Sequence, residues 1–319
     1  MRTAHARWAT APRAALARVP CMLLCILVGA AALSACGGRD LDAIGEPGNP
    51  FVLILSPDHA VDEAAREALE RALDQAAGMT VQVVVAPNSQ AAVSRTGTDR
   101  FDAAILPLFD YLFCQQENGV VAGLQVLRGD GLRTYHGDIL VRAADGPKDL
   151  AALAGKRVAF VDRYSTSGFL FPAALLSEQG VQPDGAFLGT HKAALAELRA
   201  GRAEAAATFE GAAGGDGSLR VLAQTAAIPN EPIFFRRGLD GAKRDKVVMA
   251  LMQLSQSSAG RAQLKAVADI SGFVPVTDAA YTEVHKAIED AGSGVVDLVP
   301  QGWRIRHENA RSLLGDFAL

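Results

Sequence analysis

Three consecutive hydroxyl side chains follow a short apolar run in the middle of the chain. They are Ser165, Thr166 and Ser167, and Gly168 comes directly after them. Hydroxyl groups donate hydrogen bonds, and a glycine lets the backbone approach a ligand closely. The helix predicted to follow would add unpaired N–H groups and the positive end of its dipole. A tetrahedral oxyanion fits such a turn, so the pattern predicts an anion-binding site.

A simpler role for these residues is helix capping, because Ser and Thr are preferred where a helix begins. One cap needs one hydroxyl, and three in succession exceed that need, which favours anion binding. The turn lacks the spaced glycines and the lysine of a Walker A loop, so nucleotide hydrolysis is not indicated.

A histidine stands at the start of another predicted helix. His191 follows Thr190, a suitable N-cap. An imidazole there could donate a hydrogen bond to a phosphoryl oxygen from the side opposite the hydroxyl groups. The alternative is a surface or capping histidine with no ligand.

Three further polar residues, Tyr111, Tyr135 and Glu210, lie near predicted strand ends. A phenol can donate to an oxyanion while its ring closes a cleft, although packing is the alternative for each tyrosine. Glu210 cannot donate to a fully ionised phosphoryl group. It could accept a proton from a protonated oxyanion or pair with a ligand ammonium, and the alternative is a solvated loop carboxylate.

These residues need a scaffold that brings strand ends together, and the chain alternates strand-like and helical segments. Alternation without hairpin signals favours parallel sheets covered by helices on both faces. About 270 mature residues suffice for two lobes, the second inserted into the first, with a ligand between them. We expect strands over residues 51–55, 80–86, 102–106, 120–127, 137–142, 157–161, 203–208, 219–224 and 233–235, and helices over 61–77, 108–117, 149–154, 191–200, 243–256, 260–268 and 281–291 and after Ser167.

The N-terminus has the pattern of an export signal. Residues 1–35 carry four arginines, no acidic residue and an apolar run over 22–33 that is short for a permanent membrane span. The sequence Leu33-Ser34-Ala35-Cys36 resembles the lipobox of bacterial lipoproteins, which implies a lipid on Cys36. We therefore expect a membrane-anchored protein that faces the periplasm or the cell exterior. Residues 36–50 would form a flexible tether, and the folded part would begin near Phe51.

Composition restricts the partners. Removing the four signal arginines leaves 27 basic against 35 acidic residues, a mature net charge of about −8 that would repel nucleic acid. Cys114 is the one cysteine left unmodified after processing, so neither a disulfide framework nor a CxxC metal site is expected. We predict no cofactor and no metal.

The motifs together resemble the phosphate, phosphite and phosphonate-binding proteins of ABC importers, the PhnD-like family. The resemblance covers residues 51–268 and rests on FVDRYSTSGFLFP at 160–172, GTHK at 189–192 and IPNEP at 228–232. It implies an α/β, two-lobed type II periplasmic-binding-protein fold, with mixed sheets flanked by helices and strands that cross at a hinge. The family often has an aromatic residue after the second strand, where this chain has APNS at 86–89.

The resemblance also implies roles for the candidate residues. Ser165, Thr166 and Ser167 would cradle the phosphonyl group, with His191 as partner donor and Tyr111 as the aromatic of the first lobe. Glu210 falls near a carboxylate that meets the ligand amine in aminophosphonate binders.

The expected function is capture of a phosphorus oxyanion by lobe closure and its delivery to an ABC permease and ATPase by a monomer that is not an enzyme. Lobe 1 would comprise residues 51–142 and 226–300, lobe 2 residues 143–225, and 301–319 a C-terminal tail.

Two alternatives remain open. A binding protein that signals to a membrane sensor would use the same hinge. A hydrolase would use Ser165 or Ser167 as nucleophile and His191 as base, with Asp162 orienting it, but neither serine lies in a G-x-S-x-G elbow.

Overall fold

The structure is a computed structural model that describes residues 39–56, 61–215, 217–290 and 292–314. The segment Arg39–Leu319 belongs to one compact unit. The predicted export signal and Cys36 lie outside the described residues. No helix within the described ranges combines the length and the apolar character needed to cross a membrane.

A six-stranded mixed sheet forms the centre of what we call the first lobe. Strand β1 pairs in parallel with β2 and β3, while β12 is antiparallel to β3 and β4, and β13 is antiparallel to β4. All five residues of β1 are buried, as expected of a continuous apolar run covered on both faces. The order is β13-β4-β12-β3-β1-β2, with β1 (Phe51–Leu55), β2 (Val81–Val85), β3 (Ala103–Ile105), β4 (Val121–Leu127), β12 (Pro232–Phe235) and β13 (Gly272–Pro275).

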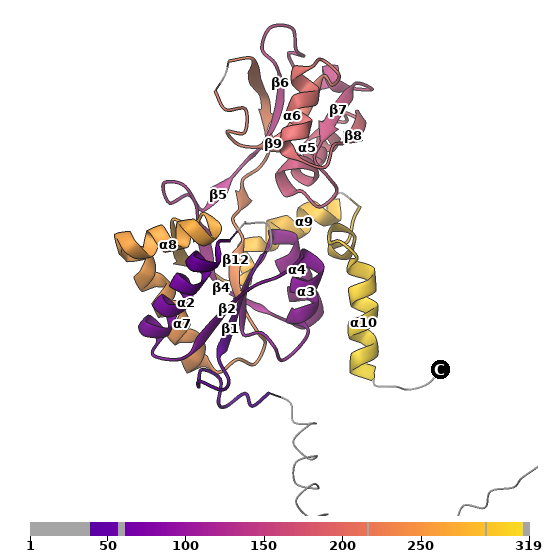
Figure 1. Ribbon diagram of the computed structural model, residues 1–319. Coiled ribbons are helices and arrows are strands. Elements are labelled where there is room, and N and C mark those ends of the chain that lie inside the picture. The colour runs from indigo at the N-terminus through magenta and orange to yellow at the C-terminus, as the bar shows by residue number, and fades with distance from the viewer. Residues whose placement is uncertain (1–38, 57–60, 216, 291, 315–319) are drawn as a thin grey trace, which may run out of the picture. The chain divides into compact units, whose positions relative to one another are not determined.

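Helices cover both faces of this sheet (Figure 1). One face packs against α2 (Glu63–Ala77), α7 (Gly241–Gln256) and α8 (Ser258–Ala268). The other packs against α3 (Ser89–Thr96), α4 (Leu108–Asn118), α9 (Thr282–Asp290) and α10 (Gly302–Leu314). In α2 the buried residues Leu69, Leu73 and Ala77 recur every four positions, which places them on one side of the helix.

A five-stranded mixed sheet forms the second lobe. Strand β7 is parallel to β8 and β9, whereas β6 runs antiparallel to β9 and β10. Helices α5 (Phe171–Glu178) and α6 (His191–Arg199) belong to separate buried clusters of this lobe. Both sheets are thus mixed, as the resemblance implies, and not all parallel, as alternation alone favours. The order is β10-β6-β9-β7-β8, with β6 (Gly137–Arg142), β7 (Arg157–Phe160), β8 (Asp184–Phe187), β9 (Ala205–Phe209) and β10 (Leu219–Gln224).

The chain passes between the lobes through a two-stranded antiparallel ribbon of β5 (Thr134–Tyr135) and β11 (Ile228–Pro229). Strand β6 follows β5, and within the described residues it pairs only with strands of the second sheet. The second lobe therefore begins at Gly137, and the predicted boundary at residue 143 is wrong because it assigned β6 to the first lobe.

Residues 39–50, predicted to be a flexible tether, pack on the first lobe. Ile44 is buried in the cluster that includes α2. The Arg39 guanidinium lies 2.7 Å from the Asp102 carboxylate and 2.7 Å from the side-chain oxygen of Asn49. The described residues before β1 thus belong to the folded lobe from Arg39 onward, and the predicted start near Phe51 is too late.

The C-terminal segment also differs from its prediction. Residues predicted as a separate tail include α10, whose Ile305 is buried and whose Arg306 pairs with Glu117 of α4 at 2.6 Å. The predicted helix over 149–154 is a single 3-10 turn, Ala151–Leu153. The sequence reasoning missed α3, β8 and β13.

Candidate functional site

The hydroxyl-rich turn joins β7 to α5 through one turn of π-helix, Thr166–Leu170. Ser165 caps this turn, because its Oγ accepts a hydrogen bond from the Gly168 N–H at 3.0 Å. The Leu170 N–H donates to the Ser165 carbonyl oxygen at 3.1 Å, the five-residue spacing of a π-turn. Thr166 and Ser167 instead line the cavity described below. Capping and cavity-lining positions thus fall on different hydroxyl groups.

Gly168 is required by packing within the turn. A Cβ at this position would lie 2.4 Å from Val161 Cγ2 and 2.7 Å from Ser165 Oγ. Gly168 is not among the residues that line the cavity. Its small size therefore lets the turn close against the end of β7, and the predicted role in backbone approach to a ligand is not supported.

His191 begins α6 and lines the cavity. Its Nδ1 lies 2.8 Å from Thr208 Oγ1, and its ring meets the edge of Phe209 with the centroids 4.9 Å apart. Burial lowers the pKa of the imidazole, and the nearby charge of Asp162 partly offsets this. When the Thr208 hydroxyl donates to Nδ1, Nε2 carries the proton and can donate to a ligand.

Tyr135, in the ribbon strand β5, and Glu210, the residue after β9, also line the cavity. Burial and then the negative charge of Glu231 raise the pKa of Tyr135 to about 12, while hydrogen bonding to Ser167 and Thr166 acts in the opposite direction. The phenol therefore stays protonated as a donor at neutral pH. Glu210 has an exposed side chain, and its backbone N–H donates to the His136 carbonyl oxygen.

The cavity has a volume of about 680 Å³ and is lined by both lobes and by the ribbon. The first lobe contributes the carboxyl ends of β1 and β3 and the start of α4, which is the usual ligand side of an open α/β sheet. Described residues that line it include Leu55, Ser56, Ile105, Leu106, Pro107, Leu108, Arg128, Leu132, Tyr135, Thr166, Ser167, His191, Phe209, Glu210, Asn230 and Glu231.

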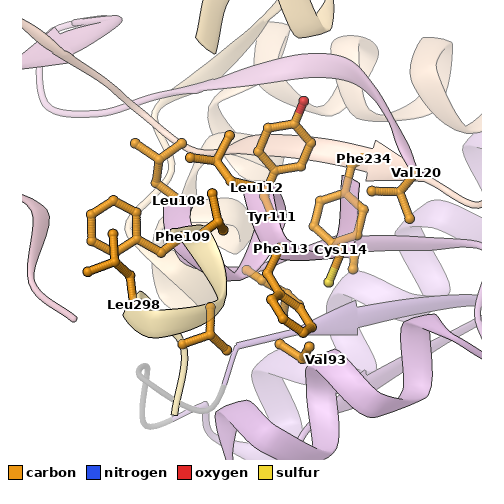
Figure 2. Close-up of a cluster of buried hydrophobic side chains, with 14 of the residues drawn as sticks. Val93, Leu108, Phe109, Tyr111, Leu112, Phe113, Cys114, Val120, Phe234 and Leu298 are labelled. Carbon is orange, nitrogen blue, oxygen red and sulfur yellow. The ribbon is translucent and has the colours of Figure 1, made fainter. Parts of the chain in front are cut away.

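Tyr111 does not line this cavity. Its ring is completely buried against Phe234 and Tyr281, and its hydroxyl donates to Asp278 Oδ1 at 2.6 Å. Figure 2 shows the ring inside the cluster with its hydroxyl at the edge. Burial, reinforced by Asp278, raises the pKa of this phenol. The structure therefore gives Tyr111 a packing position and does not bring it to the predicted site.

Arg128, Leu132, Phe209 and Glu231 are among the cavity-lining residues that sequence reasoning did not single out. Arg128 pairs with Glu231 across 103 positions of sequence, which no local pattern could reveal. Phe209 lies between Thr208 and Glu210 at the end of β9, so the strand-end argument used for Glu210 could have found it.

The arrangement differs from a hydrolase triad. In a triad, Nδ1 of the base is hydrogen-bonded to a carboxylate, whereas here Nδ1 of His191 meets Thr208. Asp162 Oδ1 accepts a hydrogen bond from the Tyr164 N–H, and Ser165 Oγ is used as a cap. In the part of the chain that the structure describes, no group of three His, Cys, Asp or Glu side chains could hold a metal ion. Thr166, Ser167, Tyr135 and His191 can offer neutral hydrogen-bond donors to the cavity, beside the charged side chains of Arg128, Glu210 and Glu231.

The chain is similar to known proteins over most of its length. Residues 51–281 match the family described as ABC transporter, phosphonate, periplasmic substrate-binding protein. A phosphate-import protein, PhnD, from Mycolicibacterium smegmatis is 29% identical over 196 residues. That alignment covers 56% of this chain and 61% of the relative, so the chain matches less than two thirds of the relative's length.

Solved structures of low sequence identity share the fold. A Xanthomonas citri protein bound to ATP superposes with a TM-score of 0.62 at 19% identity, covering 81% of this chain and 98% of that one. A binding component of a Pseudomonas aeruginosa phosphonate transporter gives 0.59 at 15% identity, covering 83% and 96%. A Prochlorococcus marinus PhnD protein in complex with methylphosphonate gives 0.58 at 15% identity, covering 76% and 98%.

Proposed function

This chain belongs to the family of periplasmic substrate-binding proteins of phosphonate ABC transporters, and on that premise we propose that it captures a phosphorus oxyanion for an ABC permease and its ATPase. The supporting observation is that Thr166, Ser167, Tyr135 and His191 converge on one cavity lined by both lobes. Hydroxyl, phenol and imidazole donors are suited to the oxygens of a phosphonate, phosphite or phosphate. The ligand class of the relatives agrees with this choice of donors.

Binding would act through lobe closure. The donors come from the second lobe and the ribbon, while the opposite wall of the cavity belongs to the first lobe. A ligand that contacts both walls binds the closed form more tightly and shifts the population toward it. The permease would then recognise the closed form. No covalent step is needed, which is consistent with a transport component and not an enzyme.

A panel of tetrahedral anions tests this function. We expect phosphate, phosphite, methylphosphonate or 2-aminoethylphosphonate to stabilise the mature chain, and sulfate, which carries no phosphorus, to have little effect. A ligand at a hundred times its dissociation constant should raise the free energy of unfolding by about 2.7 kcal/mol. Thermal shift and calorimetry would measure it. Stabilisation by none of the phosphorus oxyanions, or equally by sulfate, would contradict the proposal.

We further propose that export and a lipid on Cys36 hold the protein at a membrane. The lipobox-like Leu33-Ser34-Ala35-Cys36 after an apolar run supports this. Cells fed a labelled fatty acid should incorporate the label into the protein, and Cys36→Ala should abolish incorporation. Equal labelling of the variant would show that the acylated residue lies elsewhere. Absence of label from the parent protein would contradict the proposed lipid anchor.

A further inference from the structure

The two walls of the cavity differ in chemistry. Thr166, Ser167 and His191 line it on the second-lobe side. The first-lobe wall is largely hydrocarbon, but it also carries the polar side chains of Ser56, Arg128 and Glu231. Its apolar members come from the ends of β1 and β3 and the start of α4, namely Leu55, Ile105, Leu106, Pro107 and Leu108.

Two large apolar side chains in the cavity are open to solvent. Leu132 is 59% exposed and Phe209 is 43% exposed. Exposed apolar side chains that gather in one concave site are typical of surfaces that receive an apolar ligand group. Phe209 also contacts the ring of His191 edge-on, so it lies beside one of the proposed phosphoryl donors. A substituent on a phosphorus atom held near His191 would therefore meet the Phe209 ring.

The volume of the cavity allows such a substituent. A water molecule has a share of about 30 Å³ in the liquid, so about 680 Å³ would hold on the order of twenty waters. Phosphate has only five non-hydrogen atoms and would displace a small part of them. Lobe closure would reduce the volume of the cavity and bring the same hydrocarbon wall closer to the ligand. An apolar wall favours an apolar substituent over a charged oxygen, because a charged oxygen would lose its hydration there.

The carboxylates near the cavity do not favour a ligand amine. Glu231 is already paired with Arg128. Glu210 is exposed, and a pair between solvated charges contributes from nothing to about fivefold in affinity. Each methylene group buried against the apolar wall contributes about fourfold. An ammonium facing that wall would in addition lose its hydration.

We propose that the site is selective for phosphonates that carry an uncharged alkyl or aryl group. This inference rests on the proposed function above. The phosphonate oxygens contact Thr166, Ser167 and His191, and the organic group packs against Phe209, Leu132 and the hydrocarbon wall of the first lobe.

Calorimetry with a matched ligand pair tests the selectivity. n-Propylphosphonate and 2-aminoethylphosphonate have the same number of non-hydrogen atoms and differ in a terminal methyl against a terminal ammonium. With the mature chain from Cys36 onward, produced without lipid, we expect n-propylphosphonate to bind about tenfold more tightly than 2-aminoethylphosphonate. It should also bind about sixteenfold more tightly than methylphosphonate, because two more methylene groups are buried at about fourfold each.

Variants locate the apolar subsite. Phe209→Ala should weaken n-propylphosphonate binding about tenfold and leave phosphate binding within twofold, which also shows that the variant is folded. Phe187→Ala is the matched control, because Phe187 is likewise 43% exposed but lies outside this cavity. Glu210→Gln should leave n-propylphosphonate binding unchanged.

Each other result has a defined meaning. Tighter binding of 2-aminoethylphosphonate that is lost in Glu210→Gln would overturn this inference and leave the phosphorus-oxyanion function intact. Phosphate or methylphosphonate as the tightest ligand would do the same, as would equal loss of phosphate and n-propylphosphonate binding in a folded Phe209→Ala. Binding of none of the four would overturn the proposed function and this inference with it.

Discussion

Replacing Thr166 and Ser167 together with alanine will weaken phosphonate binding by about two to four orders of magnitude. Both side chains line the cavity at the start of the π-turn. Each would donate a hydrogen bond to a charged oxygen, and such bonds contribute about 1.5 to 3 kcal/mol each. At 1.4 kcal/mol per factor of ten, two of them account for the predicted loss. Calorimetry on the variant and the parent protein would measure it.

Ser165→Ala is the control for this experiment because it removes a hydroxyl from the same turn. Its Oγ caps the Gly168 N–H and does not line the cavity. Loss of an N-cap costs roughly 1 kcal/mol of stability, so this variant should unfold more easily and lose less than tenfold in affinity. An affinity loss in Ser165→Ala as large as that of the double variant would show that the assignment of capping and binding hydroxyls is wrong.

Asp102→Ala will lower the free energy of unfolding by about 3 to 5 kcal/mol without changing ligand affinity. The Asp102 side chain is completely buried, accepts the Val52 N–H at 2.9 Å, and lies 2.7 Å from Arg39 and 3.5 Å from Arg236. Removing one partner of a buried ion pair leaves the other charge uncompensated, which explains the size of the loss. Urea denaturation would measure it, and the melting temperature should fall on the order of 10 °C.

Asp99→Ala provides the matched comparison. Asp99 also accepts a hydrogen bond from Arg39, at its backbone N–H, but it is exposed. Its removal should cost less than about 1 kcal/mol, because water replaces the lost partner. Equal free energies of unfolding for the two variants would mean that burial does not determine how much Asp102 contributes to stability.

Local patterns predicted much of the fold. The apolar run at Phe51–Leu55 became a buried strand, and α2 ended where Gly78 adopts the left-handed conformation, with φ of 62°. The turn at Ser165–Gly168 and the histidine at the start of α6 were found for the same reason. Strand ends and helix starts depend on neighbours in sequence.

Long-range contacts account for what the sequence did not reveal. Tyr111 was expected at the edge of the cavity, but seven consecutive residues of α4 are buried, because the C-terminal segment with Val295, Leu298 and Ile305 packs in the same cluster. The ion pair of Arg39 with Asp102 joins positions 63 residues apart. Strand β6 entered the second sheet because its partners, β9 and β10, come later in the chain.

The docking of Arg39 determines how far the folded unit could move from a lipid on Cys36. Arg39 is attached where β1 and β3 begin, near Val52 and Asp102, whereas the cavity is lined by Leu55 and Ile105, where these strands end. Two residues lie between Cys36 and Arg39, so three Cα–Cα steps give a reach of at most about 11 Å. A five-residue strand is already about 17 Å long. A lipid on Cys36 would thus hold the folded unit close to the bilayer, because the connecting segment is shorter than one five-residue strand. The cavity, at the other ends of β1 and β3, would open to the surrounding compartment.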